Sequence, residues 1–578
     1  MKSVLLLAVI ALPARAHPQG DAPPLDRTAP ADSTETRRST ERAARTFEQR
    51  RLRLLPNVPS SVGGSGDVII GRYRYAAGEA DDLTPPPAEP PEIAELRRSL
   101  LRTLDSASRA MPGDSWIRSR LVWYAIEAGD TALAVSAARG CRDDDLAWWC
   151  DALLGLALHA SRRFVDAERA FDRALLAMPD STRCRWTDVT LLLDGKAETL
   201  IERTPCEGRA SLNERLWWLA DPFHSVEGNE LRSEHFARHA FTVLHDRWRA
   251  THPLGWGSDM REIVLRYAWP VAWSRDRVDE RSPTQPGYHI ALTGHEPNPA
   301  YDFFPDADAL QSPYDASDSS WQLKRPRATT HYAHPLGAPL RPIRHQIARF
   351  RRGDSLLIVA AWNASGDTLF TTAPGRAALV VSSEGGGRTF TARSDAAAAR
   401  GSLSLVVPNV DHVASLELFS GSSRAAGRAR QGIRASASTG GLAISDVLLV
   451  EPGERPRSLA EAVDLRLADA KVGPDRRVTL FWEVYGLEPG ALPRVTVSVS
   501  RIRASRARRL AERIGLRDEP QTVHADWAAD APATQTAAGS LTLDLRDRPA
   551  GTWRVTITVS AGSSNTATAQ RDLVLGSR

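Results

Sequence analysis

Lysine and cysteine are scarce in this chain, and long apolar runs are nearly missing. Only four of the 74 basic residues are lysine, and 70 acidic residues leave a net charge of +4. So small an excess argues against a dedicated nucleic-acid-binding protein. The charged share of 25% is that of an ordinary soluble protein, which excludes wholesale disorder and a membrane bundle. At 578 residues the chain is too long for one hydrophobic core and predicts several domains.

The one notable apolar run lies at the N-terminus. A lysine at position 2 precedes the apolar residues 4–12, and the small residues Ala14 and Ala16 follow. This order is typical of a signal peptide cleaved after Ala16. The run is far shorter than the ~20 residues that cross a bilayer. We therefore expect residues 1–16 to be a signal peptide, and the mature protein to be periplasmic or secreted and not membrane-spanning.

Cysteine occurs only four times, within one stretch of the N-terminal half. An even number in an exported chain favours disulfides. Three pairings are possible, and the local one closes the shortest loops, Cys141 with Cys150 and Cys184 with Cys206. A zinc site is the alternative, but neither a Cys-x-x-Cys pair nor a suitably spaced histidine supports it.

Helical periodicity begins at about residue 92 and continues to about residue 249. Before it, residues 17–66 show no sustained period and predict a disordered tail, with at most a short helix near residues 42–55. Residues 67–250 are expected to form a helical, tetratricopeptide-like region that carries the disulfides, with a generic helical bundle as the alternative. Its repeat-packing residues would be Leu154, Gly155, Ala167, Phe171, Ala174 and Pro179.

The period changes from helical to alternating after about residue 343. Apolar residues at every second position, separated by turn clusters, are typical of strands. A Pro-Ala-Gly turn at 549–551 enters the last strands, as in many immunoglobulin-like domains. The pattern predicts two immunoglobulin-like β-sandwiches, at 343–455 and 456–578, although residues 442–449 fit either one.

The sixteen residues from Gly255 to Pro270 carry the most specific pattern of the chain. They resemble the signature of the GWxTD-domain family, Gly-Trp-x-Thr-Asp followed by an Ile, an Arg-Tyr-Gly and a Pro. Ser258 replaces the family's Thr and keeps a hydroxyl, whereas Ala268 replaces a family glycine. Residues 217–223 and 229–235 also look like exported members with helical repeats. That family is a bacterial domain of unknown function, so the resemblance implies compartment and organisation but no reaction.

The motif also has a structural interpretation that needs no ligand. Ser258 or Asp259 can cap a turn through a side-chain oxygen. Beyond it, Ile263, Leu265 and Tyr267 alternate with more polar residues, which predicts a strand with one buried face. One Asp and two Arg make no acid–base or nucleophile set. We expect a structural turn and strand, with an interaction site as the alternative; its residues would be Gly255, Trp256, Ser258, Asp259, Arg266, Tyr267 and Pro270.

An enzymatic alternative rests on two histidines. His235 and His239 are spaced i and i+4 on a predicted helix, which suits a metal ion. The zincin pattern His-Glu-x-x-His is not met, because Glu234 precedes the first histidine. Core or solvated histidines are the simpler interpretation, so no catalytic residue, metal or cofactor is predicted. A metal-assisted hydrolase using this pair remains the alternative.

The expected organisation is a multidomain α+β protein. The helical region leads into a GWxTD-like segment with a Pro- and aromatic-rich loop region, at 251–342, and then into the two sandwiches. We predict a non-catalytic scaffold or binding protein of the cell envelope, whose helical repeats bind a protein or peptide partner. A metal-assisted hydrolase and a glycan-binding protein that uses the sandwiches are the alternatives. The oligomeric state and disulfide connectivity stay open.

Overall fold

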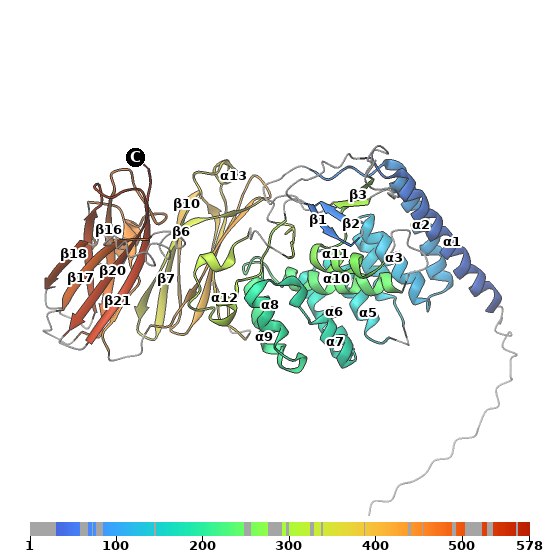
Figure 1. Cartoon of the computed structure of the whole chain (residues 1–578), viewed down its shortest axis with the longest axis horizontal. Helices are drawn as coiled ribbons and strands as arrows, with labels where there is room; N and C mark the ends of the chain where they lie inside the picture. Colours follow the sequence, from blue (N-terminus) through green and yellow to red (C-terminus); the bar gives the residue numbers. More distant parts are fainter. Residues whose placement is uncertain are drawn as a thin grey trace, which may run out of the picture.

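The computed structural model shows an elongated molecule, with helices at one end and paired β-sheets at the other (Figure 1). The predicted signal peptide and Gly255 lie outside the residues that the structure describes. No described helix has the length and apolarity to cross a membrane. The described residues are 30–57, 67–71, 73–76, 85–143, 146–247, 256–275, 292–295, 300–323, 329–336, 339–385, 388–436, 441–453, 455–487, 493–502, 523–528, 536–561 and 565–577.

The N-terminal half is predominantly helical, as predicted, and each helix from α1 to α5 packs against the next one along the chain. Aspartates cap several of these helices; for example, the Asp114 side chain accepts a hydrogen bond from the Ile117 backbone. The helices are α1 (Pro30–Leu54), α2 (Pro91–Ala110), α3 (Ser115–Glu127), α4 (Thr131–Arg139), α5 (Trp149–Ala160), α6 (Phe164–Ala177), α7 (Asp180–Trp186), α8 (Gly195–Glu202), α9 (Ala210–Ala220), α10 (Glu230–Asp246) and α11 (Ser258–Tyr267), with 3-10 turns η1 (Thr190–Leu192), η2 (Cys206–Gly208) and η3 (Asp318–Trp321).

Helix α1 differs from the disordered tail expected over residues 17–66. It packs along α2, and its buried residues recur at helical spacing, among them Ala44, Phe47 and Arg51. The Phe47 ring meets the ring of Tyr124 edge-on, with 5.3 Å between centroids. Charged residues dominate α1, so its narrow apolar stripe was hidden in the sequence. The neighbouring helices supply the burial that stabilises it.

A small four-stranded sheet joins distant parts of the chain, in the order β1-β2-β4-β3. Strand β2 pairs in parallel with β4, and β3 pairs with β4 in antiparallel register. The sheet therefore brings β1 and β2, which precede helix α2 in the chain, beside the end of the motif. Its strands are β1 (Asp67–Ile70), β2 (Tyr73–Ala76), β3 (Ala272–Arg275) and β4 (Leu292–His295).

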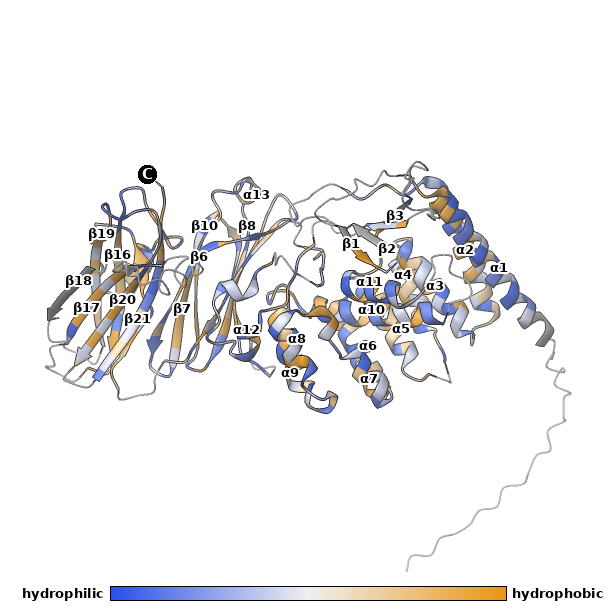
Figure 2. Cartoon of the chain, in the orientation of Figure 1, coloured by the Kyte–Doolittle hydropathy of each residue, from blue (hydrophilic) through white to orange (hydrophobic). Residues whose placement is uncertain are grey.

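The first β-sandwich packs a three-stranded sheet, β10-β7-β6, against a five-stranded one, β5-β12-β11-β8-β9. Ile358, Leu379 and Leu416, which come from the two sheets, share one apolar core. Hydrophobic residues follow these strands in Figure 2. The strands are β5 (Leu340–Pro342), β6 (Arg344–Arg352), β7 (Ser355–Asn363), β8 (Gly375–Ser382), β9 (Phe390–Ala397), β10 (Arg400–Pro408), β11 (His412–Phe419) and β12 (Ala426–Ile433), with short helices α12 (Ala307–Gln311) and α13 (Thr368–Thr371) nearby.

The second β-sandwich begins earlier than the boundary predicted after residue 455. Strands β13 and β14 pair with β16, so residues 443–450 belong to this unit. A hydrophobic contact layer that includes Phe350 and Phe481 joins the two sandwiches. The elements are β13 (Ala443–Ile444), β14 (Leu448–Val450), α14 (Leu459–Asp464), β15 (Lys471–Val472), β16 (Arg477–Tyr485), β17 (Arg494–Arg501), β18 (Val523–Ala528), β19 (Thr536–Asp544), β20 (Gly551–Ala561) and β21 (Asn565–Leu575).

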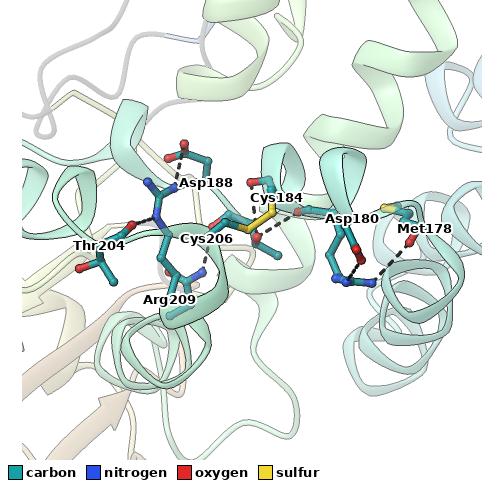
Figure 3. Close-up of a disulfide and its surroundings, with 10 residues drawn as sticks. Met178, Asp180, Cys184, Asp188, Thr204, Cys206 and Arg209 are labelled. Atoms are coloured by element: carbon teal, nitrogen blue, oxygen red, sulfur yellow. Dashed lines mark hydrogen bonds and ion pairs between the residues drawn. A yellow bond between two sulfur atoms is a disulfide. The ribbon is translucent and has the colours of Figure 1, made fainter.

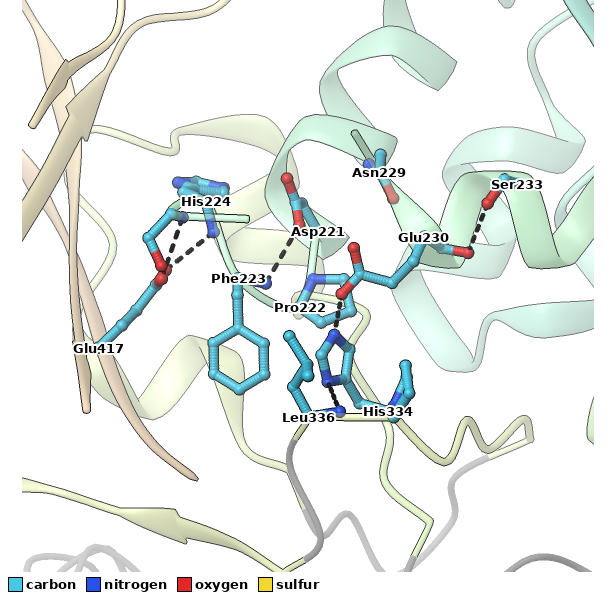
Figure 4. A network of polar contacts seen from close by, with 12 residues as sticks. Asp221, Pro222, Phe223, His224, Asn229, Glu230, Ser233, His334, Leu336 and Glu417 are labelled. Carbon is cyan, nitrogen blue, oxygen red and sulfur yellow. Dashed lines mark hydrogen bonds and ion pairs between the residues drawn. The ribbon is translucent and has the colours of Figure 1, made fainter. Parts of the chain in front are cut away.

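Side chains of the first sandwich hold the segment that follows α9 (Figure 4). Glu417 on β11 accepts hydrogen bonds from the backbone N–H groups of residues 224 and 225, at 2.8 and 3.0 Å. Arg430 on β12 donates to the carbonyls of Leu219 and Asp221, at 2.7 and 2.9 Å. The last carbonyls of a helix have no partner within the helix. These contacts therefore satisfy the end of α9 and fix the helical half on the sandwich.

A second buried contact at this interface joins Glu230, the first residue of α10, to the imidazole of His334. Burial raises the pKa of Glu230 to about 8. Burial also lowers the pKa of His334 to about 3. At neutral pH the carboxyl group is therefore protonated and the imidazole uncharged. The His334 Nδ1 accepts from the backbone N–H of Leu336, so the ring proton is on Nε2, which donates to the carboxyl group of Glu230. The aromatic-rich loop region packs here as well, with Phe303, Phe304 and Trp321 buried in the same apolar cluster as the α9 residues.

Candidate functional site

The motif residues 258–267 form helix α11 instead of the expected strand. Its buried residues, Met260, Ile263, Val264 and Tyr267, are spaced as one face of a helix. The alternation of Ile263, Leu265 and Tyr267 was misleading because Leu265 lies on another, less buried face. Packing against α10 decides between the two periods.

The start of α11 is fastened to the end of α10. The Trp256 indole N–H donates to the Asp246 carboxylate at 2.7 Å, and Arg261 pairs with the same carboxylate at 2.5 Å. Trp256 also lies against the ring of His245, with 4.8 Å between centroids. The tryptophan of the motif therefore contacts Asp246 and His245 within the fold.

Asp259 lies against the turn between β1 and β2. A Cβ at Gly71 would come within 2.6 Å of the Asp259 Cβ, and Gly71 has a φ of +55°. Only glycine meets both requirements without strain. The neighbouring Ser258 is exposed at the first position of α11. The motif's acidic residue thus contacts the small sheet, which places that sheet on the motif helix.

The end of α11 is held by Arg238 from α10. Its guanidinium donates to the carbonyls of Leu265 and Arg266, at 3.1 and 2.7 Å. Arg266 itself forms an ion pair with Glu262 at 3.0 Å. The buried ring of Tyr267 contacts His331 edge-on. A cation at the carboxyl end of a helix also offsets the helix dipole.

Ala268, directly after α11, has a φ of +67° and a ψ of −179°. This region is essentially restricted to glycine. The alanine at this position therefore carries backbone strain. Two residues on, Pro270 packs over Gly294, where a Cβ would lie 2.5 Å from the proline ring. The chain is thus turned sharply away from α11 into β3.

A cavity of about 420 Å³ opens beside the end of the motif. We call it the motif cavity. Helices α1, α2, α3, α5, α10 and α11 and strand β3 contribute to its walls, so the helical region and the motif share it. Its apolar lining includes Leu55, Ile93, Trp123, Ile126, Leu156, Ala160, Ala237, Phe241, Val264, Ala268, Trp269, Pro270 and Trp273.

One wall of the motif cavity carries a buried chain of ion pairs. Glu127 accepts contacts from Arg51 at 2.5 Å and from Arg97 at 3.0 Å. Arg97 also pairs with Glu89. Burial alone would lower the pKa of Arg51, but attraction to Glu127 and Glu48 outweighs it and raises that pKa. These arginines are therefore compensated within the fold.

A second charged group lies at the α5–α10 contact. Glu234 receives the His159 Nε2 at 2.7 Å and the Arg238 Nε at 2.7 Å. Burial alone would raise the pKa of Glu234, but attraction to Arg238 and the hydrogen bond with His159 outweigh it and hold the pKa well below its usual value. The Ser233 hydroxyl lies 2.9 Å from His159 Nδ1 and donates to the carbonyl of Glu230. Ser233 is fully buried and does not line the cavity, whereas a serine nucleophile must be accessible to its substrate.

The indole N–H of Trp273 is buried and has no hydrogen-bond partner among the described residues. The side chain lines the motif cavity and is 8% exposed. Its ring belongs to an aromatic group, because Trp269 lies 5.4 Å from Trp273 and 5.9 Å from Trp123 between centroids. Buried indole N–H groups usually find an acceptor. A ligand with an acceptor oxygen beside an apolar group would supply it.

The repeat-packing residues lie behind this cavity, where α5 and α6 pack closely. A Cβ at Gly155 would come within 2.6 Å of the Phe171 ring. Gly155 therefore permits the approach that its place in the predicted repeat requires. Helix α6 ends at Ala177, and Pro179 directly precedes α7. The remaining repeat residues divide between the two helices, with Leu154 on α5 and Ala167 and Ala174 buried on α6.

His235 and His239 lie inside the helical core on α10. The His235 Nε2 contacts the carbonyl oxygen of Trp186 at 2.8 Å. The His239 ring stacks on Trp186, with 5.3 Å between centroids. Burial lowers the pKa of His235 to about 4 and lowers that of His239 as well. Among the described residues no group of three potential ligands forms around them.

The local disulfide pairing is confirmed. Cys141 is bonded to Cys150, and Cys184 is bonded to Cys206. The second bond joins α7 to η2, close to the ion pair of Arg209 with Asp188 (Figure 3). Such bonds are typical of proteins from oxidising compartments.

The structure brings Arg266, Tyr267 and Pro270 to the cavity end of the motif, while Trp256 and Asp259 fasten its other end. The sequence analysis did not find His159, Glu234 and Arg238 as one group, because residues far apart in the chain form it. It also missed Trp273. Ala268 was visible as a departure from the family pattern, and that departure was the one local signal of the strained turn.

Comparisons with known proteins add little to this geometry. No protein-family model matches the sequence, and no curated protein does. Among solved structures, the FN1–FN3 domains of chicken CNTN1 align at 10% identity and a TM-score of 0.15, over 41% of this chain and 68% of theirs. A likeness at this TM-score carries no argument about fold or function.

Proposed function

We propose that this chain is a non-catalytic binding protein of the cell envelope, which holds a protein or peptide segment in the motif cavity. The supporting observation is the buried, unpartnered indole N–H of Trp273 in an aromatic-lined cavity. Apolar pockets with a few placed polar groups are the usual form of a ligand site.

The charges around the cavity favour an uncharged ligand group. Arg51, Arg97 and Arg238 all have carboxylate partners within the protein. A charged ligand would compete with these pairs and lose its hydration without compensation. An apolar side chain beside a backbone carbonyl meets both demands, because the carbonyl accepts from Trp273 while the side chain fills the aromatic lining. An extended peptide offers this combination.

Further features agree with this proposal. The strain at Ala268 lies on the cavity wall, and backbone strain is concentrated at functional sites. Tetratricopeptide-like packing of α3 to α6 would make the region a repeat array, a class that binds peptides. The GWxTD-like segment and the two immunoglobulin-like sandwiches would complete an exported protein. The signal-peptide pattern and the disulfides favour the periplasm or secretion.

Selection from a random linear-peptide library on the mature chain tests the proposal. Enriched peptides are then titrated against wild type and Ala160→Trp, which fills the cavity from the last turn of α5. The control is Ala177→Trp, which adds the same side chain at the exposed last residue of α6. We expect Ala160→Trp to weaken binding about tenfold or more, and the control to leave it unchanged. Failure of selection, or equal affinity in both variants, would refute binding in this cavity.

Trp273→Phe tests the predicted acceptor directly. The substitution removes the N–H and keeps an aromatic ring. We expect a selected peptide to bind about fivefold more weakly, because the substitution removes roughly one hydrogen bond. Unchanged affinity would show that the N–H has no acceptor in the complex.

A further inference from the structure

We infer that a second cleft, on the other side of α10, binds the basic side chains of an extended peptide. This cleft lies between α6, α7 and α9 and has a volume of about 690 Å³. Helix α10 contributes Arg232 and Phe236 to it, with the preceding Asn229, whereas Glu234, Ala237 and Phe241 line the motif cavity. The two sites therefore lie on different faces of one helix and share no lining residue.

The cleft is acidic although the whole chain is slightly basic. Five carboxylates and three arginines line it, which gives the lining a net charge of −2, whereas the net charge of the whole chain is +4. Arg232 pairs with Glu168 and Asp172, at 3.3 and 2.6 Å. The second lining arginine, Arg183, pairs with Asp180. Glu168, Asp172 and Asp180 thus each have an arginine partner, but two arginines serve three carboxylates.

The two remaining carboxylates have no arginine partner among the residues that the structure describes. Glu207 and Glu214 are exposed and have no ion-pair partner within the described residues. The third arginine of the cleft, Arg209, is directed to Asp188 at 3.0 Å. Two carboxylates are therefore available to a cationic ligand.

A buried acceptor lines the same cleft. Asn213 is 8% exposed, and its Oδ1 has no hydrogen-bond partner in the described part of the chain. Its Nδ2 donates to the carbonyl of Thr187 at 2.9 Å, which orients the side chain. A buried amide oxygen without a donor is costly, and a guanidinium or ammonium N–H would satisfy it.

Aromatic rings complete the recognition of a cation. Trp217 and Trp218 line the cleft from α9. The Trp218 indole N–H donates to the Ser382 hydroxyl at 3.0 Å, so the ring is held in place. Tryptophan faces attract guanidinium and ammonium groups. The Cys184–Cys206 disulfide ties α7 to η2 along the cleft, which maintains its shape (Figure 3).

The test uses a fluorescein-labelled, acetylated hexapeptide of alternating Arg and Gly, with a Glu-Gly hexapeptide as the charge-reversed probe. Binding to the mature chain is followed by fluorescence anisotropy. The Glu207→Gln/Glu214→Gln double variant removes the uncompensated carboxylates. Glu198→Gln/Glu202→Gln removes the same charge from exposed positions on α8, outside the cleft.

We expect the Arg-Gly peptide to bind, and the cleft variant to weaken binding about fivefold, while the α8 variant stays within about twofold of wild type. The Glu-Gly peptide should not bind. Absence of Arg-Gly binding, or an equal loss in both double variants, would overturn the inference. Ala160→Trp should retain Arg-Gly binding, so failure of the motif-cavity proposal and failure of this one are distinguishable.

Discussion

The helical half and the second β-sandwich fill their interiors with different chemistry. The apolar core of the sandwich consists of aliphatic side chains with Trp482 and Trp553, and its buried charged residues include Arg476 and Glu483, which keep 7% and 6% exposure. The helical half buries Arg120, Glu230 and His245 completely, beside its apolar residues. A sheet needs only one apolar face per strand, whereas this helical interior depends on particular partners for its charges. The stability of the helical half should therefore respond most to substitutions of single buried polar residues, and that of the second sandwich to lost side-chain volume.

The largest effect is expected at Arg238. Replacing it with Met leaves Glu234 with one cation fewer and frees the carbonyls at the end of α11. Breaking a buried pair by removing one partner costs about 3–5 kcal/mol. Urea unfolding, followed by the helical circular dichroism signal, measures it. Val497→Ala in the second sandwich serves as the comparison and should cost about 2 kcal/mol through lost volume; an equal or smaller cost for Arg238→Met would contradict the contrast.

A pH dependence is expected from Glu230. Burial raises its pKa from the ordinary value of 4.5 to about 8. The folded state therefore keeps a proton that the unfolded state loses, so this group's contribution is full below pH 4.5 and is lost as pH rises toward 8. Relative to Glu230→Gln, the wild type should lose roughly 2–4 kcal/mol of unfolding free energy across that window. Parallel pH profiles for the two proteins would show that Glu230 is ionised throughout.

The Cys184–Cys206 disulfide closes a loop within the helical half, so its removal should affect that half and not the sandwiches. A Cys184→Ser/Cys206→Ser variant should lose about 2–3 kcal/mol of unfolding free energy in the helical half. The variant should also weaken binding of the Arg-Gly peptide more than binding of any peptide selected for the motif cavity, because the disulfide lies along the acidic cleft. Separate unfolding transitions of the two halves provide the measurement. An equal shift of both transitions would indicate that they unfold as one unit.

The smallest expected effect is a gain. Ala268→Gly relieves a backbone conformation that alanine adopts only under strain, so it should stabilise the helical half by about 1 kcal/mol. Gly353→Ala, at a φ of +60° in the β6–β7 turn of the first sandwich, should have the opposite sign and a similar size. Thermal unfolding of both variants checks the pair. Destabilisation by Ala268→Gly would mean that the alanine methyl group contributes packing that outweighs the strain.

Prediction from the sequence succeeded where a local pattern decides the structure. The helical region and the two sets of strands follow from spacing along the chain, and the presence of disulfides follows from the even number of cysteines, whereas the structure decides their local pairing. It failed where neighbours decide. Helix α1 depends on burial against α2 and α3, and residues 443–450 belong to the second sandwich because β16 offers them a free edge. The motif helix likewise follows from packing on α10.

The sequence by itself determined the order of a helical region and a strand region, the low net charge, and the positions of the cysteines. Periodicity, composition and spacing are local properties, so these features need no partner. Tertiary structure alone decided the motif cavity and the acidic cleft. Trp273 reaches the cavity from β3, His159 from α5 and Arg238 from α10, and Asn213 enters the cleft from α9. The pKa shifts of Glu230 and Glu234 also required the fold, because burial and paired charges exist only once distant segments meet.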